Sequence, residues 1–242
     1  PGGVVAVIAP HAGHRYSGRT AGHAFRAVQG RSVDLVVIIA PMHRYHPGVI
    51  LTSAHPAYGT PLGTVEIDHP ALEQLEQLLN EAGAPTLTRV AYDEEHALEI
   101  ELPFLQRALS GPFQLLPLML RSQEPQPAQA LAAALSKLLA GRNALLVAST
   151  DLSHFYPQAV AARLDKEMLS RIAAFAPEKI FAAEHGGWGY ACGASAVSAV
   201  LWAARELGGS QVVLLDYSTS ADETGDPTSV VGYGAAAVIK TV

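Results

Sequence analysis

The feature that most constrains the fold of this chain is a pair of short apolar runs, each ending in Ala-Pro with a histidine close behind. The runs cover Val4–Ala9 and Leu35–Ala40, and most of their residues are β-branched or leucine. Such continuous apolar runs are typical of strands buried on both faces of a parallel sheet. His11 and His43 follow the two runs, so both are expected in loops at the carboxyl edge of the sheet, where open α/β proteins bind ligands.

Strand-like runs alternate with helical patterns along the whole chain. The strand-like runs are Val4–Ala9, Leu35–Ala40, Val49–Thr52, Phe113–Leu120, Ala144–Ser149, Val212–Tyr217 and Val230–Ile239. The helical patterns are Thr20–Val28, His69–Ala82, Ala97–Ala108 with a kink expected at Pro103, Pro127–Leu139, Ala159–Ala174 and Gly193–Leu207. This alternation predicts an α/β fold with a central, mostly parallel or mixed sheet covered by helices on both faces. The strands ending at Ala9, Ala40 and Ser149 should be neighbours. The final pair, Val212–Tyr217 and Val230–Ile239, is expected either to form a hairpin at a sheet edge or to carry a loop that reaches over the site.

The composition excludes several classes of protein. With 242 residues the chain fits one large domain or two small ones, and because no linker-like stretch interrupts it we predict a single domain over residues 1–242. The net charge is −6 and the cations are scattered along the sequence, which argues against a nucleic-acid surface. No apolar run reaches the ~18 residues of a membrane span. The single cysteine suits a reducing cytoplasm.

Cys192, the only cysteine, stands directly before the helical pattern that begins at Gly193. A helix N-terminus lowers the pKa of a thiol, and the thiolate is the form that binds metal. The sequence therefore predicts a metal site formed by His11, His43 and Cys192, although a free cysteine can also be a small buried hydrophobic residue. His46 shares the loop of His43 and is the alternative ligand, but His43 lies nearer the strand end, where the backbone is more rigid.

Two further groups are candidates for proton transfer. His154 follows a strand-like run in Asp151-Leu152-Ser153-His154, where Asp151 could orient a histidine or cap the next helix, or do both. His96 ends the motif Asp93-Glu94-Glu95-His96. The acidic residues of this motif are also explained by a helix start, where they complement the helix dipole. His96 is therefore a candidate both for a role in the site and for an ordinary residue beside the helix. The other histidines show no sign of converging and are treated as ordinary surface or core residues: His14, His23, His55, His69 and His185.

Five motifs occur in order along the chain. They are Ile8-Ala9-Pro10-His11-Ala12-Gly13 with Tyr16 and Gly18, Ala40-Pro41-Met42-His43, Asp93-Glu94-Glu95-His96 with Glu99 and Leu102-Pro103, Ser149-Thr150-Asp151-Leu152-Ser153-His154, and Cys192-Gly193. In this order they resemble the MEMO family, whose bacterial and archaeal members are called AmmeMemoRadiSam system protein B. The resemblance runs from about residue 4 to the last strand. It also implies that an N-terminal segment usual in the family is missing from this sequence.

The resemblance implies a fold similar to that of the class III extradiol dioxygenases, which are non-haem iron enzymes. It implies that His11 and His43 are metal ligands, that Cys192 takes the place of the dioxygenases' glutamate ligand, and that His154 matches their acid–base histidine. A thiolate favours copper or zinc and still permits iron. Iron or copper is the expected metal, with zinc as the alternative. The resemblance further implies an AMMECR1-like protein and a radical S-adenosylmethionine enzyme as partners in a pathway.

The sequence thus predicts a metal-dependent, dioxygenase-like oxidoreductase that acts on a small molecule, with His154 moving protons and Asp151 and His96 supporting the site. The main alternative is a non-enzymatic module that binds peptides or handles metal on the same scaffold. Metal-assisted hydrolysis is a third reading, because an open zinc site activates water.

Overall fold

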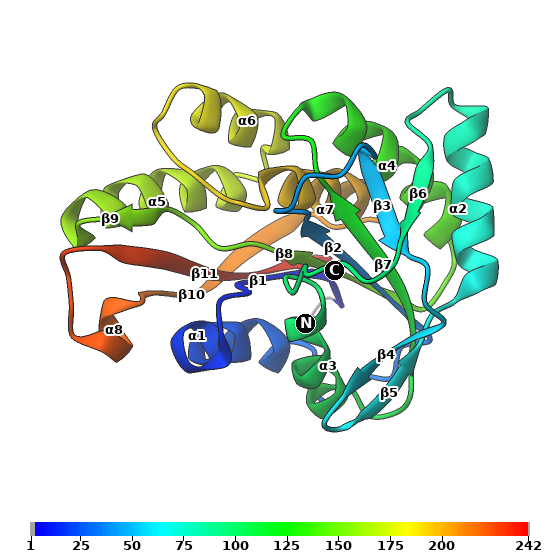
Figure 1. Ribbon diagram of the computed structural model, residues 1–242, viewed down its shortest axis with the longest axis horizontal. Helices are drawn as coiled ribbons and strands as arrows, with labels where there is room; N and C mark the ends of the chain where they lie inside the picture. Colours follow the sequence, from blue (N-terminus) through cyan, green and yellow to red (C-terminus); the bar gives the residue numbers. More distant parts are fainter. Residues whose placement is uncertain (1–2, 242) are drawn as a thin grey trace.

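The computed structural model describes residues 3–241, and a twisted sheet runs through the middle of the molecule (Figure 1). The sheet has nine strands, eight of them in the order β10-β11-β1-β8-β2-β7-β3-β6, with β9 paired to β11. The bounds of these strands are β1 Val4–Ala9, β2 Leu35–Pro41, β3 Ile50–Ser53, β6 Leu87–Val90, β7 Gln114–Leu120, β8 Ala144–Ser149, β9 His154–Tyr156, β10 Gln211–Thr219 and β11 Val230–Ile239.

The four central strands β1, β8, β2 and β7 are parallel neighbours. Every residue of β2 is buried, as are the last five of β1 and of β8, because helices cover both faces of the sheet. The prediction that the strands ending at Ala9, Ala40 and Ser149 lie side by side is confirmed. Their carboxyl ends therefore meet at one edge of the sheet, which brings the loops that follow them together.

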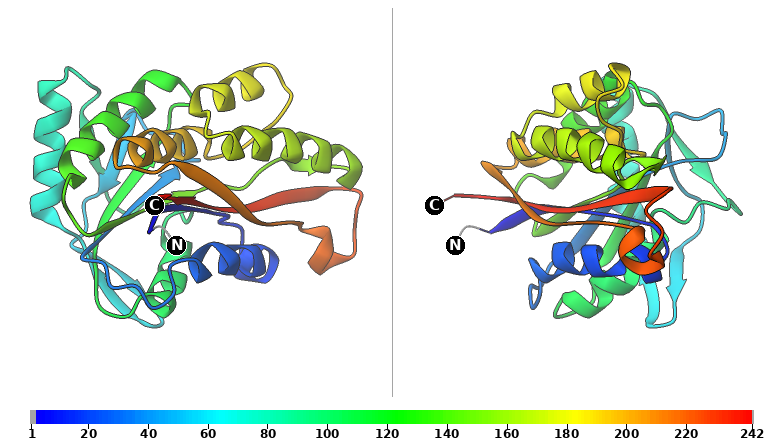
Figure 2. Two further views of the ribbon diagram at one scale, coloured as in Figure 1. Left: turned by 180° about the vertical axis from the view of Figure 1, so that it is seen from behind. Right: turned by 90° about the vertical axis from the view of Figure 1, so that its left-hand side faces the viewer.

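Helices pack on both faces of the sheet (Figure 2). One face carries α2 (His69–Glu81), α4 (Pro125–Leu139), α5 (Gln158–Ala173), α6 (Pro177–His185) and α7 (Ala194–Glu206). The other face carries α1 (His14–Arg26), α3 (Leu102–Ala108) and a small hairpin of β4 (Ala57–Thr60) and β5 (Gly63–Glu66). Each face has its own apolar core, so the predicted fold class, a single α/β domain with a mixed sheet between helices, is confirmed.

The strand direction reverses on both sides of the parallel centre. β3 is antiparallel to β7 on one side, and β11 is antiparallel to β1 on the other. β10 and β11 form the antiparallel hairpin at the sheet edge that was one of the two expectations for this pair, joined through the short helix α8 (Ala221–Thr224). Across residues 3–241, every helix is too short or too polar to cross a lipid bilayer.

Two expectations about helices are wrong. Helix α1 begins at His14 rather than Thr20, because the Gly13 carbonyl accepts the backbone N–H groups of Tyr16 and Ser17 and so closes a first turn there. The segment after residue 97 is not one helix kinked at Pro103. A short 3₁₀ turn, Glu99–Glu101, precedes α3, and Pro103 lies in the first turn of α3, where a missing N–H costs nothing.

Candidate metal centre

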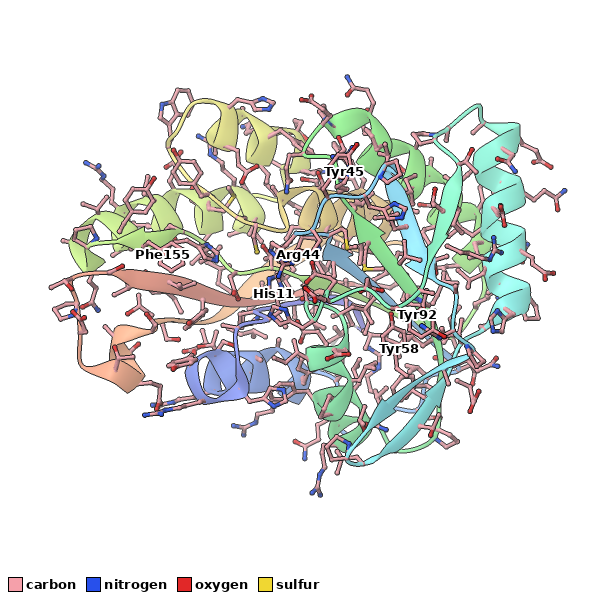
Figure 3. All side chains as sticks on the ribbon, viewed as in Figure 1. His11, Arg44, Tyr45, Tyr58, Tyr92 and Phe155 are labelled. Carbon is pink, nitrogen blue, oxygen red and sulfur yellow. The ribbon has the colours of Figure 1, made fainter. Side chains whose placement is uncertain are left out.

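The predicted ligands converge beside the carboxyl edge of the sheet, where Figure 3 labels His11. His11 lies just past β1, His43 just past β2, and Cys192 shortly before α7. One ligand atom from each of these three residues can be chosen so that all three atoms lie within 4.8 Å of one another. This is the only such group of ligating side chains within residues 3–241. The convergence expected from the sequence is therefore present in the structure.

His11 is buried and held from both sides. Its Nδ1 lies 2.8 Å from the Ser149 hydroxyl, and its Nε2 lies 3.2 Å from the Cys192 Sγ. Burial lowers the pKa of His11 to about 4, so the ring is neutral at physiological pH. A neutral imidazole carries one proton and offers its other nitrogen to a cation.

The hydrogen bonds around Ser149 decide which nitrogen of His11 carries the proton. The Ser149 Oγ lies 2.6 Å from the Ala97 carbonyl and 2.8 Å from the Glu101 Oε1. A carbonyl oxygen can only accept, so it takes the single hydroxyl proton, and the two other neighbours of Oγ must donate. His11 must then be protonated at Nδ1, which leaves Nε2 for a metal. By the same reasoning, Glu101 must be protonated.

Glu101 is completely buried, which agrees with this assignment. Burial raises the pKa of Glu101 well above its ordinary range, so the neutral carboxylic acid is the favoured form. Its Oε2 has no hydrogen-bond partner among the described residues. A neutral carboxyl oxygen tolerates this far better than a carboxylate oxygen would.

His43 is oriented by Glu95. The carboxylate oxygens of Glu95 lie 3.0 and 3.1 Å from the His43 Nδ1, and Oε2 accepts the His43 backbone N–H at 2.6 Å. Oε1 also accepts the backbone N–H groups of His96 and Ala97. Burial opposes ionisation of Glu95, but the hydrogen bonds from His43 and Ala97 outweigh it and lower the pKa of Glu95 to about 2. The hydrogen bond to Glu95 in turn raises the pKa of His43. The Nε2 of His43 is left for a cation.

Cys192 is a partly buried thiol that receives a backbone hydrogen bond. The Asp151 N–H donates to its Sγ at 3.2 Å. The expectation that a helix N-terminus lowers its pKa is wrong: burial, with a further contribution from the Asp151 carboxylate, raises the pKa of Cys192 far above its ordinary range. Metal binding at this residue must therefore displace a proton.

Asp151 anchors the loop of His11 and does not cap a helix. Its Oδ1 accepts the backbone N–H groups of His11 at 2.9 Å and Ala12 at 3.2 Å. No helix follows it directly, because the chain continues into β9 at His154. Among the described residues Asp151 makes no hydrogen bond to His154, so the orienting role considered for it applies to the backbone of His11 instead.

His154 and His96 line the same cavity, which measures about 410 Å³. The Nδ1–H of His154 donates to the Leu152 carbonyl at 2.9 Å, so that in the neutral ring Nε2 is the nitrogen free to accept a proton. The His96 ring is half-exposed, with its centroid 6.2 Å from that of His11. At the mouth of the cavity Arg44 forms an exposed ion pair with Glu94 at 3.2 Å.

The loop of Asp151 and His154 is tied to strand β11. Gly232 accepts the backbone N–H of Leu152 at 2.8 Å and donates its own N–H to the Ser153 carbonyl at 2.9 Å. From the other side, the buried Asp165 accepts the Ser153 N–H at 2.9 Å. The loop is thereby fixed by two elements that lie after it in the chain.

The remaining histidines stay outside the site. The His46 Nδ1 accepts the backbone N–H of Gly48, two residues away, so this ring serves its own loop. His14 donates from Nε2 to the Ile100 carbonyl. None of the five histidines treated as ordinary lines the metal cavity.

Sequence reasoning missed three residues that support the ligands: Glu95, Glu101 and Ser149. The sequence pattern explains Glu95 as part of an acidic helix start and Ser149 as the end of a strand. The one signal for a role of Glu95 is its place beside His96 in the motif Asp93-Glu94-Glu95-His96. Glu101 lies in the expected helix and gave no signal beyond being a charged residue in an amphipathic segment.

Comparison with known proteins places the chain in a family. The model of the family described as Memo-like protein matches residues 3–237. A MEMO1 family protein of Nitrosopumilus maritimus is 34% identical over 233 residues, covering 96% of this chain and 84% of the relative. A MEMO1 family protein of Methanothermobacter thermautotrophicus is 36% identical over 230 residues, covering 94% of this chain and 82% of the relative.

A solved structure shares the fold. It is that of an uncharacterized protein from Escherichia coli K12, with a TM-score of 0.53 and 14% sequence identity, covering 96% of this chain and 99% of that one. At this identity the likeness concerns the fold alone, whereas the family match extends over nearly the whole sequence. The chain therefore belongs to the MEMO family.

Proposed function

We propose that this protein is a metal-dependent, dioxygenase-like oxidoreductase that acts on a small molecule, with His11, His43 and Cys192 as metal ligands. The observation that carries the proposal is the convergence of their ligand atoms to within 4.8 Å of one another. The cavity beside them, about 410 Å³, falls in the size range of small-molecule sites.

The residues present fit a metal ion. The hydrogen bonds of His11 to Ser149 and of His43 to Glu95 leave one nitrogen of each ring for the ion. Such support from neighbouring groups is usual for histidine ligands. Two imidazoles and one thiolate suit copper, iron or zinc rather than magnesium or calcium. When bound, the ion would supply Lewis-acid chemistry and, if it is iron or copper, electron transfer.

The chain's own contribution is to hold and move protons. His154 lines the cavity, and the Nε2 of its neutral ring is proposed to accept a proton from a bound small molecule. His96, half-exposed on the opposite loop, is proposed to support the bound molecule. Asp151 holds His11 in place through the backbone.

We also propose that the protein is located in the cytoplasm, because a reducing compartment suits its single cysteine. The AMMECR1-like and radical S-adenosylmethionine partners implied by the resemblance are proposed on that ground alone. In such a pathway, the small molecule would bind and react in the cavity beside the three proposed ligands.

Metal stoichiometry of two variants tests the division of roles. Cys192→Ser should lose most of the metal, because a hydroxyl is a much poorer ligand than a thiolate. His154→Ala should keep it, since His154 is proposed to move protons only. His14→Ala is the matched control, a histidine outside the cavity. Elemental analysis of anaerobically purified, reduced protein provides the measurement.

If His154→Ala loses the metal as fully as Cys192→Ser, His154 is a ligand and the division of roles is wrong. If no variant changes the metal content, these residues do not hold the ion. The non-enzymatic module is then the better reading.

A further inference from the structure

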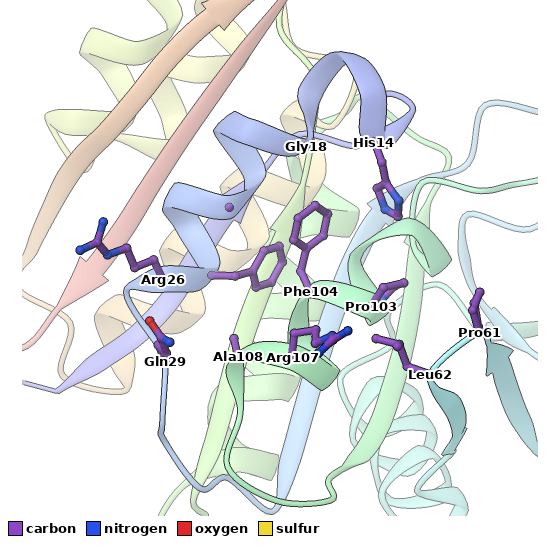
Figure 4. A pocket seen from close by; sticks show the side chains of 12 residues that line it. His14, Gly18, Arg26, Gln29, Pro61, Leu62, Pro103, Phe104, Arg107 and Ala108 are labelled. Carbon is purple, nitrogen blue, oxygen red and sulfur yellow. The ribbon is translucent and has the colours of Figure 1, made fainter.

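A second cavity, about 780 Å³, lies outside the metal centre between α1, α3 and the turn of the β4–β5 hairpin (Figure 4). It is nearly twice the size of the cavity beside the ligands, and the two share no lining residue. Its volume lies within the range of small-molecule sites. Nothing in the function proposed above uses it.

The wall of this cavity is mostly apolar. Phe25 and Phe104 stack with their ring centroids 5.2 Å apart and their planes 8° from parallel. His14 packs edge-on against Phe104 at 5.1 Å. Leu62, at the tip of the hairpin turn, lines the opposite side and remains 45% exposed. An apolar body of aromatic size would cover these surfaces.

Two glycines keep the cavity open along α1. Gly18 and Gly22 are one helical turn apart and both line it. A Cβ at Gly22 would meet no atom within 4 Å, so any side chain there would project into open space. Glycine inside a helix costs about 0.5–1 kcal/mol relative to alanine. The helix thus carries a destabilising residue where a larger one would narrow the cavity.

The charge around the cavity is positive. Arg26 and Arg107 are among its lining residues, and no Asp or Glu is. Within residues 3–241 neither arginine side chain forms an ion pair or a side-chain hydrogen bond. Helix α1 carries Arg15, Arg19 and Arg26 without one acidic residue, in a chain whose net charge is −6. In Figure 4, Arg107 lies beside Leu62 and Phe104, while Arg26 stands at the far end.

We propose that this cavity is a second binding site, for a small amphipathic carboxylate with an aromatic or similarly bulky apolar body. The apolar body lies against Phe104 and the open helix face at Gly22. The carboxylate pairs with Arg107, with Arg26 adding to the local positive field. The proposal is independent of the metal centre.

The test uses 1-naphthoate and its neutral relative 1-naphthamide, titrated by calorimetry into the full chain. We expect 1-naphthoate to saturate one site. Gly22→Leu, which narrows the cavity beside Phe104, should weaken its binding by at least about tenfold, a difference of 1.4 kcal/mol. Arg107→Gln should weaken 1-naphthoate about two- to fivefold, as for an exposed charge pair, and leave 1-naphthamide unchanged.

Matched controls are Arg19→Gln, an exposed arginine of the same helix outside the cavity, and Gly59→Leu, where a Cβ is also free of contacts. Neither should change the affinity. Gly22→Leu should keep the metal content of the parent and be at least as stable to heat, which shows that it folds. Cys192→Ser should bind 1-naphthoate as the parent does, which separates this site from the metal centre.

The proposal is overturned if 1-naphthoate fails to saturate the parent or binds Gly22→Leu equally well. Weaker binding in Cys192→Ser alone would place the carboxylate at the metal cavity instead. Equal loss of 1-naphthamide and 1-naphthoate in Arg107→Gln would contradict the assignment of the anion.

Discussion

At the scale of single residues, Glu95 makes the most direct contacts with a proposed metal ligand. It is almost entirely buried and contacts both the ring and the backbone of His43. Its neighbour Glu94 is exposed and forms an ion pair with Arg44. Of these two adjacent acids, Glu95 therefore supports the proposed ligand, whereas Glu94 forms an ion pair at the surface.

Replacing Glu95 by Gln keeps the shape of the side chain and removes its charge. We expect metal affinity to fall by about 10- to 100-fold, the range for groups that support a histidine ligand. Competition with a chromogenic chelator measures the affinity, and Glu94→Gln is the control. Equal affinity in Glu95→Gln and the parent would mean that His43 does not depend on this carboxylate for metal binding.

Glu101 links protonation to stability. Because its pKa is raised in the folded protein, the folded state keeps a proton that the unfolded chain loses above about pH 4.5. The contribution of Glu101 is complete below that pH and is lost as pH rises toward the folded pKa. Glu101→Gln has no such proton, so its free energy of unfolding relative to the parent should rise with pH.

Urea unfolding of the metal-free protein across this pH window measures the effect. Glu99→Gln, an exposed acid of the same 3₁₀ turn, is the control and should show no such trend. A difference between Glu101→Gln and the parent that is constant with pH would show that Glu101 titrates alike in both states. The hydrogen-bond assignment around Ser149 would then be wrong.

At the scale of elements, the metal centre depends on how closely α7 approaches the end of β8. Gly193 precedes α7, and a Cβ there would lie 2.4 Å from the Ser149 backbone oxygen and 2.8 Å from the Thr150 Cβ. Neither atom can move without shifting the strand end that supports His11. The helix can bring Cys192 to its position only with glycine at this contact.

Gly193→Ala should lower the free energy of unfolding by more than about 2 kcal/mol, because the added methyl group meets backbone. Gly22→Ala is the opposite case, a helical glycine beside open space, and should raise it by about 0.5–1 kcal/mol. Chemical unfolding of both variants provides the measurement. A Gly193→Ala protein as stable as the parent would show that α7 can retreat without cost.

The elements differ in how well the sequence predicts them. Val4–Ala9, Ala144–Ser149 and Val230–Ile239 have the expected bounds, because a long apolar run can be buried in few ways. The strands β4, β5, β6 and β9 were not predicted, since these three- and four-residue segments lack the aliphatic run that marks the equally short β3. Helix α6 was also missed, and its nine residues form only a short amphipathic pattern.

The same division applies to the metal centre. His11, His43 and Cys192 could be found because strand ends and helix starts are readable along the chain. Their support could not, because Glu95 and Ser149 act on partners 52 and 138 residues away. The pKa of Cys192 depends on burial, which tertiary packing alone determines. The local helix signal therefore gave the wrong direction for it.

At the scale of the whole molecule, a metal ion would join three segments that are distant in the sequence, from the ends of β1 and β2 and the start of α7. A ligand that binds only the folded state stabilises it in proportion to the logarithm of its concentration. The metal centre should therefore act as a cross-link between the first and last thirds of the chain.

Adding the preferred ion at about 1,000 times its dissociation constant should stabilise the parent by ~4 kcal/mol, a rise in melting temperature of roughly 8–16 °C. Cys192→Ser should show little of this rise. Differential scanning calorimetry with and without a chelator provides the comparison. A rise of the same size in Cys192→Ser would place the stabilising ion elsewhere on the protein.

Strand β11 has a consequence for the order of events during synthesis. It pairs with β1 and holds the loop of Asp151 and His154 through Gly232, yet the ribosome makes it after every residue of the metal centre. A nascent chain therefore exposes His11, His43 and the thiol before the scaffold that places them exists. If the site binds a metal ion, its geometry can select that ion only after residues 230–239 have left the exit tunnel, so we expect metal loading to follow the pairing of β11 and not to occur during translation.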